Sequence, residues 1–229
     1  FLTQVSIVVI MAVMNNVLVI YGAGSKYGAD IPMTVVGIVM KVFQIVISVV
    51  VGIAAGAQPI VGYNYGAGLW RRVKLIFRTM MAAEFSVGLV SLICFEVFPV
   101  QIISVFGSED GLYNEFAVLA FRVFLGGIVL CCIQKSCSIF LQSMGKPALS
   151  MLLSLLRDFV LSVPLTLVLP RFFGVTGALY SGPAADVISF GAAVLCMAAV
   201  FRKLNRLEDG EVALSGASQG GLAVERKIC

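Results

Sequence analysis

Four charged side chains lie deep inside long apolar stretches of the sequence: Lys41, Glu84, Arg157 and Asp186. An isolated charge at the centre of a bilayer costs at least ~2.5 kcal/mol, so such residues are candidates for ion binding, proton transfer or helix pairing. Lys41 lies about ten residues into its stretch, which carries a helix about 15 Å, to the membrane midplane. Glu84 reaches a similar depth from the opposite end of the next stretch. We therefore expect Lys41 and Glu84 to face each other.

Arg157 and Asp186 form a second set at matching depth in the last two apolar stretches, and Asp158 directly follows Arg157. Two interpretations stay open for both sets. Either the pairs are structural ion pairs that hold helices together, or one carboxylate binds a cation or changes its protonation state. Lys135 and Glu96 lie nearer the ends of their stretches, where we expect their side chains to extend toward the polar membrane surface.

Polar residues without charge also occur in the first two stretches. Asn15, Asn16 and Gln44 either hydrogen-bond between helices or line an aqueous cavity. The chain has no histidine, which excludes a histidine-based metal site or catalytic triad, and its six cysteines lack the paired spacing of zinc ligands. Since no set of nucleophile, base or metal ligands converges and no P-loop occurs, we expect no catalytic residue, no metal, no cofactor and no enzymatic activity.

The composition is that of a membrane protein. Hydrophobic residues make up 60% of the 229 residues, charged residues only 12%, and the mean hydropathy is +1.03. A soluble domain usually has about a quarter of its residues charged. The net charge of +4 does not indicate nucleic-acid binding, because the basic residues gather in short segments beside the apolar stretches. The expected partner is the lipid bilayer, and no nucleic acid is expected.

Six stretches reach the length of roughly 20 residues that a membrane-spanning helix needs. They run approximately over Phe1–Tyr21, Ile31–Ile60, Val73–Phe98, Phe116–Leu141, Ala148–Leu169 and Val175–Phe201. Because a β-barrel would need short alternating segments, the predicted fold class is an all-α integral membrane bundle of six transmembrane helices, residues 1–203. Residues 204–229 turn polar, and we expect them to form a disordered tail.

Lysine and arginine are distributed unequally between the two sides that the six spans define. One side receives Arg71, Arg72, Lys74, Arg78, Lys146, Arg202, Lys203 and Arg206. The other side receives Lys26 and Arg171 together with several acidic residues. The positive-inside rule assigns the first side to the cytoplasm. The sequence thus predicts a multi-pass protein of the cell membrane with a cytoplasmic C-terminal tail.

The second stretch ends in a polar string punctuated by glycine, just before the basic cluster. Its characteristic positions are Gln58, Pro59, Gly62, Tyr63, Asn64 and Gly66. We expect Pro59 to break the helix, because proline lacks the N–H donor and crowds the preceding turn. The remaining positions are expected to shape the cytoplasmic end of this helix. Gly52 and Gly56 have the spacing that lets two helix backbones approach closely in lipid.

The string Gln58–Ala67 resembles the signature of the multidrug and toxic-compound extrusion (MATE) family, especially the branch of the MepA-like drug exporters. The resemblance continues through Gly145–Pro147, Ser154–Asp158 and Ser181–Asp186, in the order of the carboxy-terminal half, helices seven to twelve. It implies one six-helix lobe of a twelve-helix transporter, with the missing amino-terminal half as its partner. It also implies secondary active export of cationic or amphipathic drugs in exchange for protons or sodium ions.

The sequence also departs from the family pattern. The sodium-driven branch carries acidic residues in helices seven and ten, but the interiors of the first and fourth spans here have none. The acidic residue that the MepA-like branch uses in helix one would lie outside this sequence, and so would that coupling site. A lipid-linked oligosaccharide flippase of the same superfamily and a purely structural membrane bundle remain alternatives. Because the chain begins at Phe1 inside an apolar run, we expect it to be the downstream piece of a longer protein.

Overall fold

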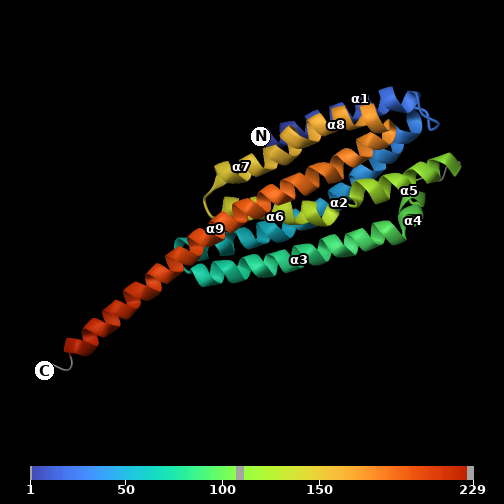
Figure 1. The fold of residues 1–229 in the computed structure, drawn as a ribbon. Helices are drawn as coiled ribbons and strands as arrows, with labels where there is room; N and C mark the ends of the chain where they lie inside the picture. The colour runs from blue at the N-terminus through green and yellow to red at the C-terminus, as the bar shows by residue number, and fades with distance from the viewer. Residues whose placement is uncertain (1, 107–110, 226–229) are drawn as a thin grey trace.

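The computed structural model describes residues 2–106 and 111–225, with side chains for 5–106 and 111–210, and its regular elements there are all helices (Figure 1). In chain order they are α1 Leu2–Ala23, α2 Asp30–Gly66, α3 Trp70–Val97, α4 Pro99–Ser104, α5 Gly111–Leu125, α6 Ile128–Ser143, α7 Pro147–Leu155, the π-helical turn η1 Leu156–Leu161, α8 Ser162–Phe173 and α9 Val175–Glu225. A helix satisfies its backbone polar groups within one segment, as lipid requires. The predicted all-α fold is confirmed.

Six segments are long and apolar enough to cross a membrane, as the sequence predicted. They are Val5–Ala23, Asp30–Gly66, Trp70–Val97, Gly111–Ser143, Pro147–Phe173 and Val175–Gly210. Two of these spans are composite: the fourth joins α5 to α6, and the fifth joins α7, η1 and α8. Both interruptions lie near the middle of the bundle, next to the charged residues described below.

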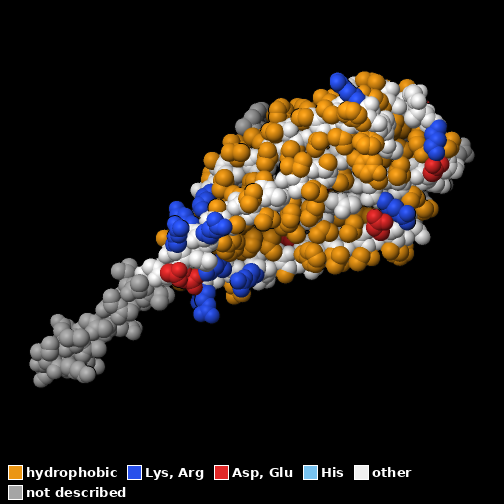
Figure 2. All heavy atoms as spheres, in the orientation of Figure 1, with side chains coloured by type: hydrophobic (Ala, Val, Ile, Leu, Met, Phe, Trp, Pro, Cys, Tyr) orange, Lys and Arg blue, Asp and Glu red, His pale blue; other side chains and the backbone are white. Residues whose placement is uncertain are grey.

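The helices form one elongated bundle with α6 at its centre. Figure 1 shows α1 and α8 along one side and α3 along the opposite side, with α6 and α9 between them. Helix α6 packs against α2, α3, α7 and α9. Hydrophobic side chains cover most of the face visible in Figure 2, while Lys and Arg gather at the end from which α9 projects. This surface is suited to lipid along the bundle and to water or lipid headgroups at its ends.

Two separate apolar clusters form the core. The first contains, among others, Leu18, Val39, Phe116, Phe121 and Leu179. The second contains, among others, Val61, Val73, Phe140, Leu141 and Leu204. On α6, Cys132 belongs to the first cluster and Cys137 to the second, so the residues between them lie at the boundary. The middle of the bundle is therefore where polar side chains from several helices meet.

A break in the fourth span lets α9 approach closely. Helix α5 ends at Leu125 and α6 begins at Ile128, and Gly126 and Gly127 lie between them. A Cβ atom on Gly127 would lie 2.9 Å from Oδ2 of Asp186 and 3.2 Å from the Pro183 backbone. Any larger residue here would displace the Asp186 carboxylate and press on the Pro183 backbone, because a real Cβ does not approach other atoms within 3.0 Å. The break therefore brings the Asp186 carboxylate against the backbone of the fourth span.

Pro59 does not break the second helix, contrary to the sequence-based prediction. Helix α2 runs without interruption to Gly66 with Pro59 inside it. Buried Ala54 and Val61 pack on either side of the proline, and the Asn64 side-chain amide donates a 2.8 Å hydrogen bond to the Ile60 carbonyl. Packing of the flanking residues holds the helix together across one missing donor. The positions Gln58 to Gly66 thus form the last turns of α2 rather than a loop.

The C-terminal boundary also differs from the one expected. Helix α9 continues through Glu225, whereas residues 204–229 were expected to be disordered, and residues 226–229 lie outside the described chain. Leu204 is buried in the second apolar cluster. The Lys74 ammonium on α3 donates a 2.8 Å hydrogen bond to the Asn205 side chain and also contacts the Glu208 carboxylate. Because these contacts fix the segment after residue 203, the packed bundle extends at least to Glu208.

Candidate functional site

Seven polar side chains from four helical elements lie between the two apolar clusters, and we call them the polar layer. They are Glu84 of α3, Gln134, Lys135 and Ser136 of α6, Arg157 and Asp158 of η1, and Asp186 of α9. Each is buried or nearly so within the described chain. Such a layer in a membrane protein is a functional-site candidate by default, because every charge in it must be compensated.

The π-helical turn η1 turns two consecutive charged residues into the bundle. Adjacent residues of a regular α-helix point about 100° apart, so two consecutive side chains seldom face the same site. A π-turn holds more residues per turn, which reduces the angle between neighbouring side chains. The Ser162 hydroxyl donates a 2.8 Å hydrogen bond to the carbonyl oxygen of Arg157, five residues earlier. Asp158 is only 2% exposed, and the Arg157 side chain is 13% exposed. Both residues therefore contribute to the same interior site.

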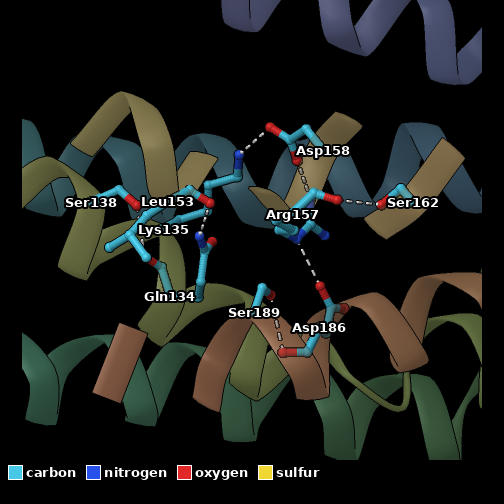
Figure 3. A network of polar contacts seen from close by, with 9 residues as sticks. All are labelled: Gln134, Lys135, Ser138, Leu153, Arg157, Asp158, Ser162, Asp186 and Ser189. Carbon is cyan, nitrogen blue, oxygen red and sulfur yellow. Dashed lines mark hydrogen bonds and ion pairs between the residues drawn. The ribbon is translucent and has the colours of Figure 1, made fainter. Parts of the chain in front are cut away.

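Four charges of the polar layer form one continuous chain of ion pairs, shown in Figure 3. Arg157 Nε donates to Asp186 Oδ1 at 2.7 Å, and an Arg157 terminal nitrogen donates to Asp158 Oδ1 at 2.7 Å. Lys135 Nζ donates to Asp158 Oδ2 at 3.0 Å. Two cations and two carboxylates alternate along this chain, so its formal charge is zero. Charge-assisted hydrogen bonds of this length are the strong ones in proteins.

The structure thus brings Arg157 and Asp186 together, as their matching depth suggested, and it adds Lys135. The expectation that Lys135 extends to the membrane surface is wrong: its side chain is 17% exposed and paired with Asp158. The sequence signal for this was the run Gln134-Lys135-Ser136, three polar residues together inside an apolar helix. Glu96, by contrast, pairs with Arg122 in an exposed position at the end of α3.

Gln134 connects the polar layer to the fifth span. Its side-chain nitrogen donates a 3.3 Å hydrogen bond to the Leu153 carbonyl of α7, just before the π-turn (Figure 3). Its side-chain oxygen and the Ser136 hydroxyl are buried without a hydrogen-bond partner in the described chain. The Gln134 amide nitrogen therefore binds the segment that leads into the π-turn. The Gln134 side-chain oxygen and the Ser136 hydroxyl remain available as hydrogen-bonding groups.

Lys41 and Glu84 are not brought together. Lys41 is exposed on α2, whereas Glu84 is fully buried, and no ion pair joins them in the described ranges. Their depths were inferred from helix length, but depth does not fix the rotation of a helix about its axis. The α2 side chains Val39 and Val42 on either side of Lys41 occupy the core, which leaves Lys41 on the outer face.

A pocket of about 550 Å³ opens onto three of the four linked charges. Its apolar wall comes mostly from α1 and α2 and includes Ile7, Met11, Met14, Met40, Phe43 and Ile47. Its polar wall includes Gln44, Ser48, Lys135, Arg157, Asp158, Ser162, Thr166 and Ser181. Gln44 therefore lies in the pocket, as one of the two interpretations proposed. Asn15 and Asn16 are exposed on α1 and do not line it.

Six membrane-length helices packed around a buried charged layer define a class of protein, the multi-pass helical membrane protein, and the comparisons with known structures agree on the fold. A structure described as the outward-facing conformation of a multidrug resistance MATE family transporter of the MOP superfamily matches 90% of this chain with a TM-score of 0.80 and 18% sequence identity. Structures described as MATE in the straight and in the bent conformation match with TM-scores of 0.80 and 0.74, at 17% and 18% identity, over 90% and 89% of this chain. No curated protein sequence is significantly similar to the chain.

The family follows from the sequence itself. The family model MatE matches residues 5–168, which is more than half of the chain, and the chain belongs to this family. It covers only 45% of the length of each of the three structures named above. The chain therefore spans about half the length of the transporters it resembles.

Proposed function

We propose that this chain is one lobe of a secondary active transporter that exports drugs in exchange for protons or sodium ions. The observation that carries the proposal is the pocket, whose methionine-rich apolar wall faces a wall of linked charges. Methionine side chains adapt to guests of different shape, and the charged wall offers a carboxylate to a cationic group. An amphipathic cation matches both walls.

The charged wall offers a physical route to coupling. Asp158 accepts hydrogen bonds from both Lys135 and Arg157. Lys135 and Asp158 both lie in the pocket wall, so a cationic guest in the pocket would compete with Lys135 for the Asp158 carboxylate. A proton or a sodium ion that binds Asp158 would also weaken its bond to Lys135. Guest and coupling ion would therefore exclude each other at Asp158, which is the requirement of an antiporter.

The same geometry argues against the flippase alternative. A lipid-linked sugar carries a pyrophosphate, which needs free positive charge in the cavity. The two cations of the pocket wall, Lys135 and Arg157, are already paired with Asp158 and Asp186. A small organic cation is therefore a better guest for this pocket than a pyrophosphate.

The proposed orientation puts the basic end of the bundle in the cytoplasm of the cell. Arg71, Arg72 and Arg78 on α3 and Arg202 on α9 are exposed at that end, where Figure 2 shows the blue side chains. The positive-inside rule supports a cytoplasmic position for this end and for the C-terminal part of α9. Guests would leave toward the opposite side.

The test uses the full-length protein in proteoliposomes with a fluorescent cationic dye. We expect export under an imposed proton or sodium gradient and loss of export when that gradient is dissipated. Asp158→Asn should lower gradient-driven export, because it removes the shared carboxylate. Glu115→Gln is the matched control, since Glu115 pairs with Lys26 at an exposed position outside the pocket. Export that ignores the gradient, or equal export by both variants, would contradict the proposal.

A further inference from the structure

Glu84 is the one member of the polar layer whose charge the described chain does not compensate. Its side chain is 0% exposed, and both carboxyl oxygens are buried without a hydrogen-bond partner. The four linked charges on the other side of α6 are all paired. A buried polar group without a partner is rare in native proteins, so this one requires an explanation.

The surroundings of Glu84 are tightly closed. Helix α3 packs on α6 here, and a Cβ atom on Gly88, one turn further along α3, would lie 3.1 Å from the Val129 backbone of α6. From α6, the Ser136 hydroxyl and the Cys132 thiol lie near the carboxyl group. The Ser136 hydroxyl faces the Glu84 carboxyl group, but the two do not reach full hydrogen-bond geometry in the described chain. The contact is therefore too close to admit a basic side chain between the two helices.

No cation neutralises the Glu84 carboxyl in the described ranges. Helices α2, α4, α5 and α9 also pack on α3, but none of them supplies a charged group to Glu84 there. Arg157 and Asp186 make no ion pair or hydrogen bond with the Glu84 carboxyl group in the described chain, and they are paired with each other. An ionised carboxylate without water or a cation is strongly disfavoured at such a place, whereas the neutral acid is not. The geometry therefore favours the protonated acid.

A metal cation would fit this place poorly. A hard cation takes six or more oxygen ligands in its usual sites. Glu84 and Ser136 are the side chains that offer oxygen here, and the backbone carbonyls around them are used by the helices. A proton needs only one carboxyl oxygen. The ligand that suits this site is the proton.

We propose that Glu84 is an occluded proton-binding site of this lobe, separate from the Arg157 ion pairs. The carboxyl group holds its proton while α3 and α6 are packed as described. When the two helices part, water reaches the group, the O–H bond breaks, and the proton passes to that water while the carboxylate stays on Glu84. Helix α6 also carries Lys135, so its displacement changes the pocket wall at the same time. The coupling of this proton to export rests on the proposed function, but the protonation does not.

Infrared difference spectroscopy on the purified full-length protein tests the protonation directly. We expect a carbonyl stretch of a protonated carboxyl group at neutral pH that shifts in D₂O and is lost in Glu84→Gln. Glu96→Gln is the matched control on the same helix, and it should keep the band because Glu96 is 45% exposed and paired with Arg122. A band that persists in Glu84→Gln overturns the proposal. Since glutamine has the size of the neutral acid, this variant is also expected to elute from size-exclusion chromatography as wild type does.

Dye export in proteoliposomes tests the coupling. Under an imposed pH gradient, Glu84→Gln should lose the gradient-driven part of export but retain dye binding, and Glu96→Gln should lose neither. If wild type and Glu84→Gln export equally, the coupling proposed for Glu84 is wrong while the proposed function stands. If wild type does not export at all, the proposed function fails, and the infrared band alone decides whether Glu84 holds a proton.

Discussion

The substitution Asp158→Asn tests whether the polar layer depends on its charge balance. Asp158 is 2% exposed and accepts one hydrogen bond at 2.7 Å and one at 3.0 Å from two different cations. The asparagine variant would leave two cations and one carboxylate among the four linked charges, with Lys135 buried beside a neutral amide. Breaking a buried pair in this way costs roughly 3–5 kcal/mol. For a chain of this size, that corresponds to a fall in melting temperature on the order of 10 °C.

Thermal unfolding of the purified protein in detergent measures this effect. Glu115→Gln provides the comparison, because it breaks an ion pair whose side chains are 59% and 55% exposed and should leave the melting temperature almost unchanged. The double variant Asp158→Asn, Lys135→Gln restores equal numbers of cations and carboxylates, since Arg157 keeps Asp186. We expect it to be more stable than Asp158→Asn alone. If the single variant is no less stable than Glu115→Gln, or if the two substitutions simply add, the reasoning from charge balance is refuted.

Two further predictions concern the ends of the bundle. Lys74→Gln removes the contact between α3 and Glu208, so trypsin should cleave after Arg206 faster, by up to about fivefold, because a surface ion pair contributes ~0.2–1 kcal/mol. Arg71→Gln, at an exposed neighbouring position, should leave the rate unchanged. Lys26 lies in the loop after α1, and its hydrogen bond to the Glu115 carboxylate of α5 raises the pKa of Lys26. This contribution to stability is complete below the ordinary lysine pKa and is lost as the pH rises through the raised one, so the melting temperatures of wild type and Lys26→Gln should converge at strongly alkaline pH.

The membrane-spanning architecture was predictable from the sequence because lipid leaves the backbone few choices. A continuous apolar stretch of roughly 20 residues that crosses the bilayer forms a helix whatever its neighbours are, because only a helix satisfies all its backbone polar groups within one segment. The same logic predicted that Arg157 and Asp186 would have to be compensated. It also paired Glu84 with Lys41, which was wrong, because depth along a helix is readable from the sequence and rotation about its axis is not.

The differences between expectation and structure share one origin. Pro59 stays inside α2, Lys135 turns inward, and the segment from Leu204 to Glu208 packs against the bundle. In each case a neighbouring helix supplies contacts that outweigh the local preference of the residue. Local rules for proline, for snorkelling lysines and for polar tails describe a helix alone in lipid or water, not one that is packed on four others.

The sequence by itself determined six apolar helices, the unequal distribution of basic residues and the presence of charges at membrane depth, since these depend on residue type and order alone. Only the tertiary structure decided that four of those charges alternate in one neutral chain beside a pocket and that Glu84 is sealed on the far side of α6. The physical reason is that the cost of a buried charge depends on the atoms within a few ångströms of it. Those atoms come from helices that are far apart in the chain.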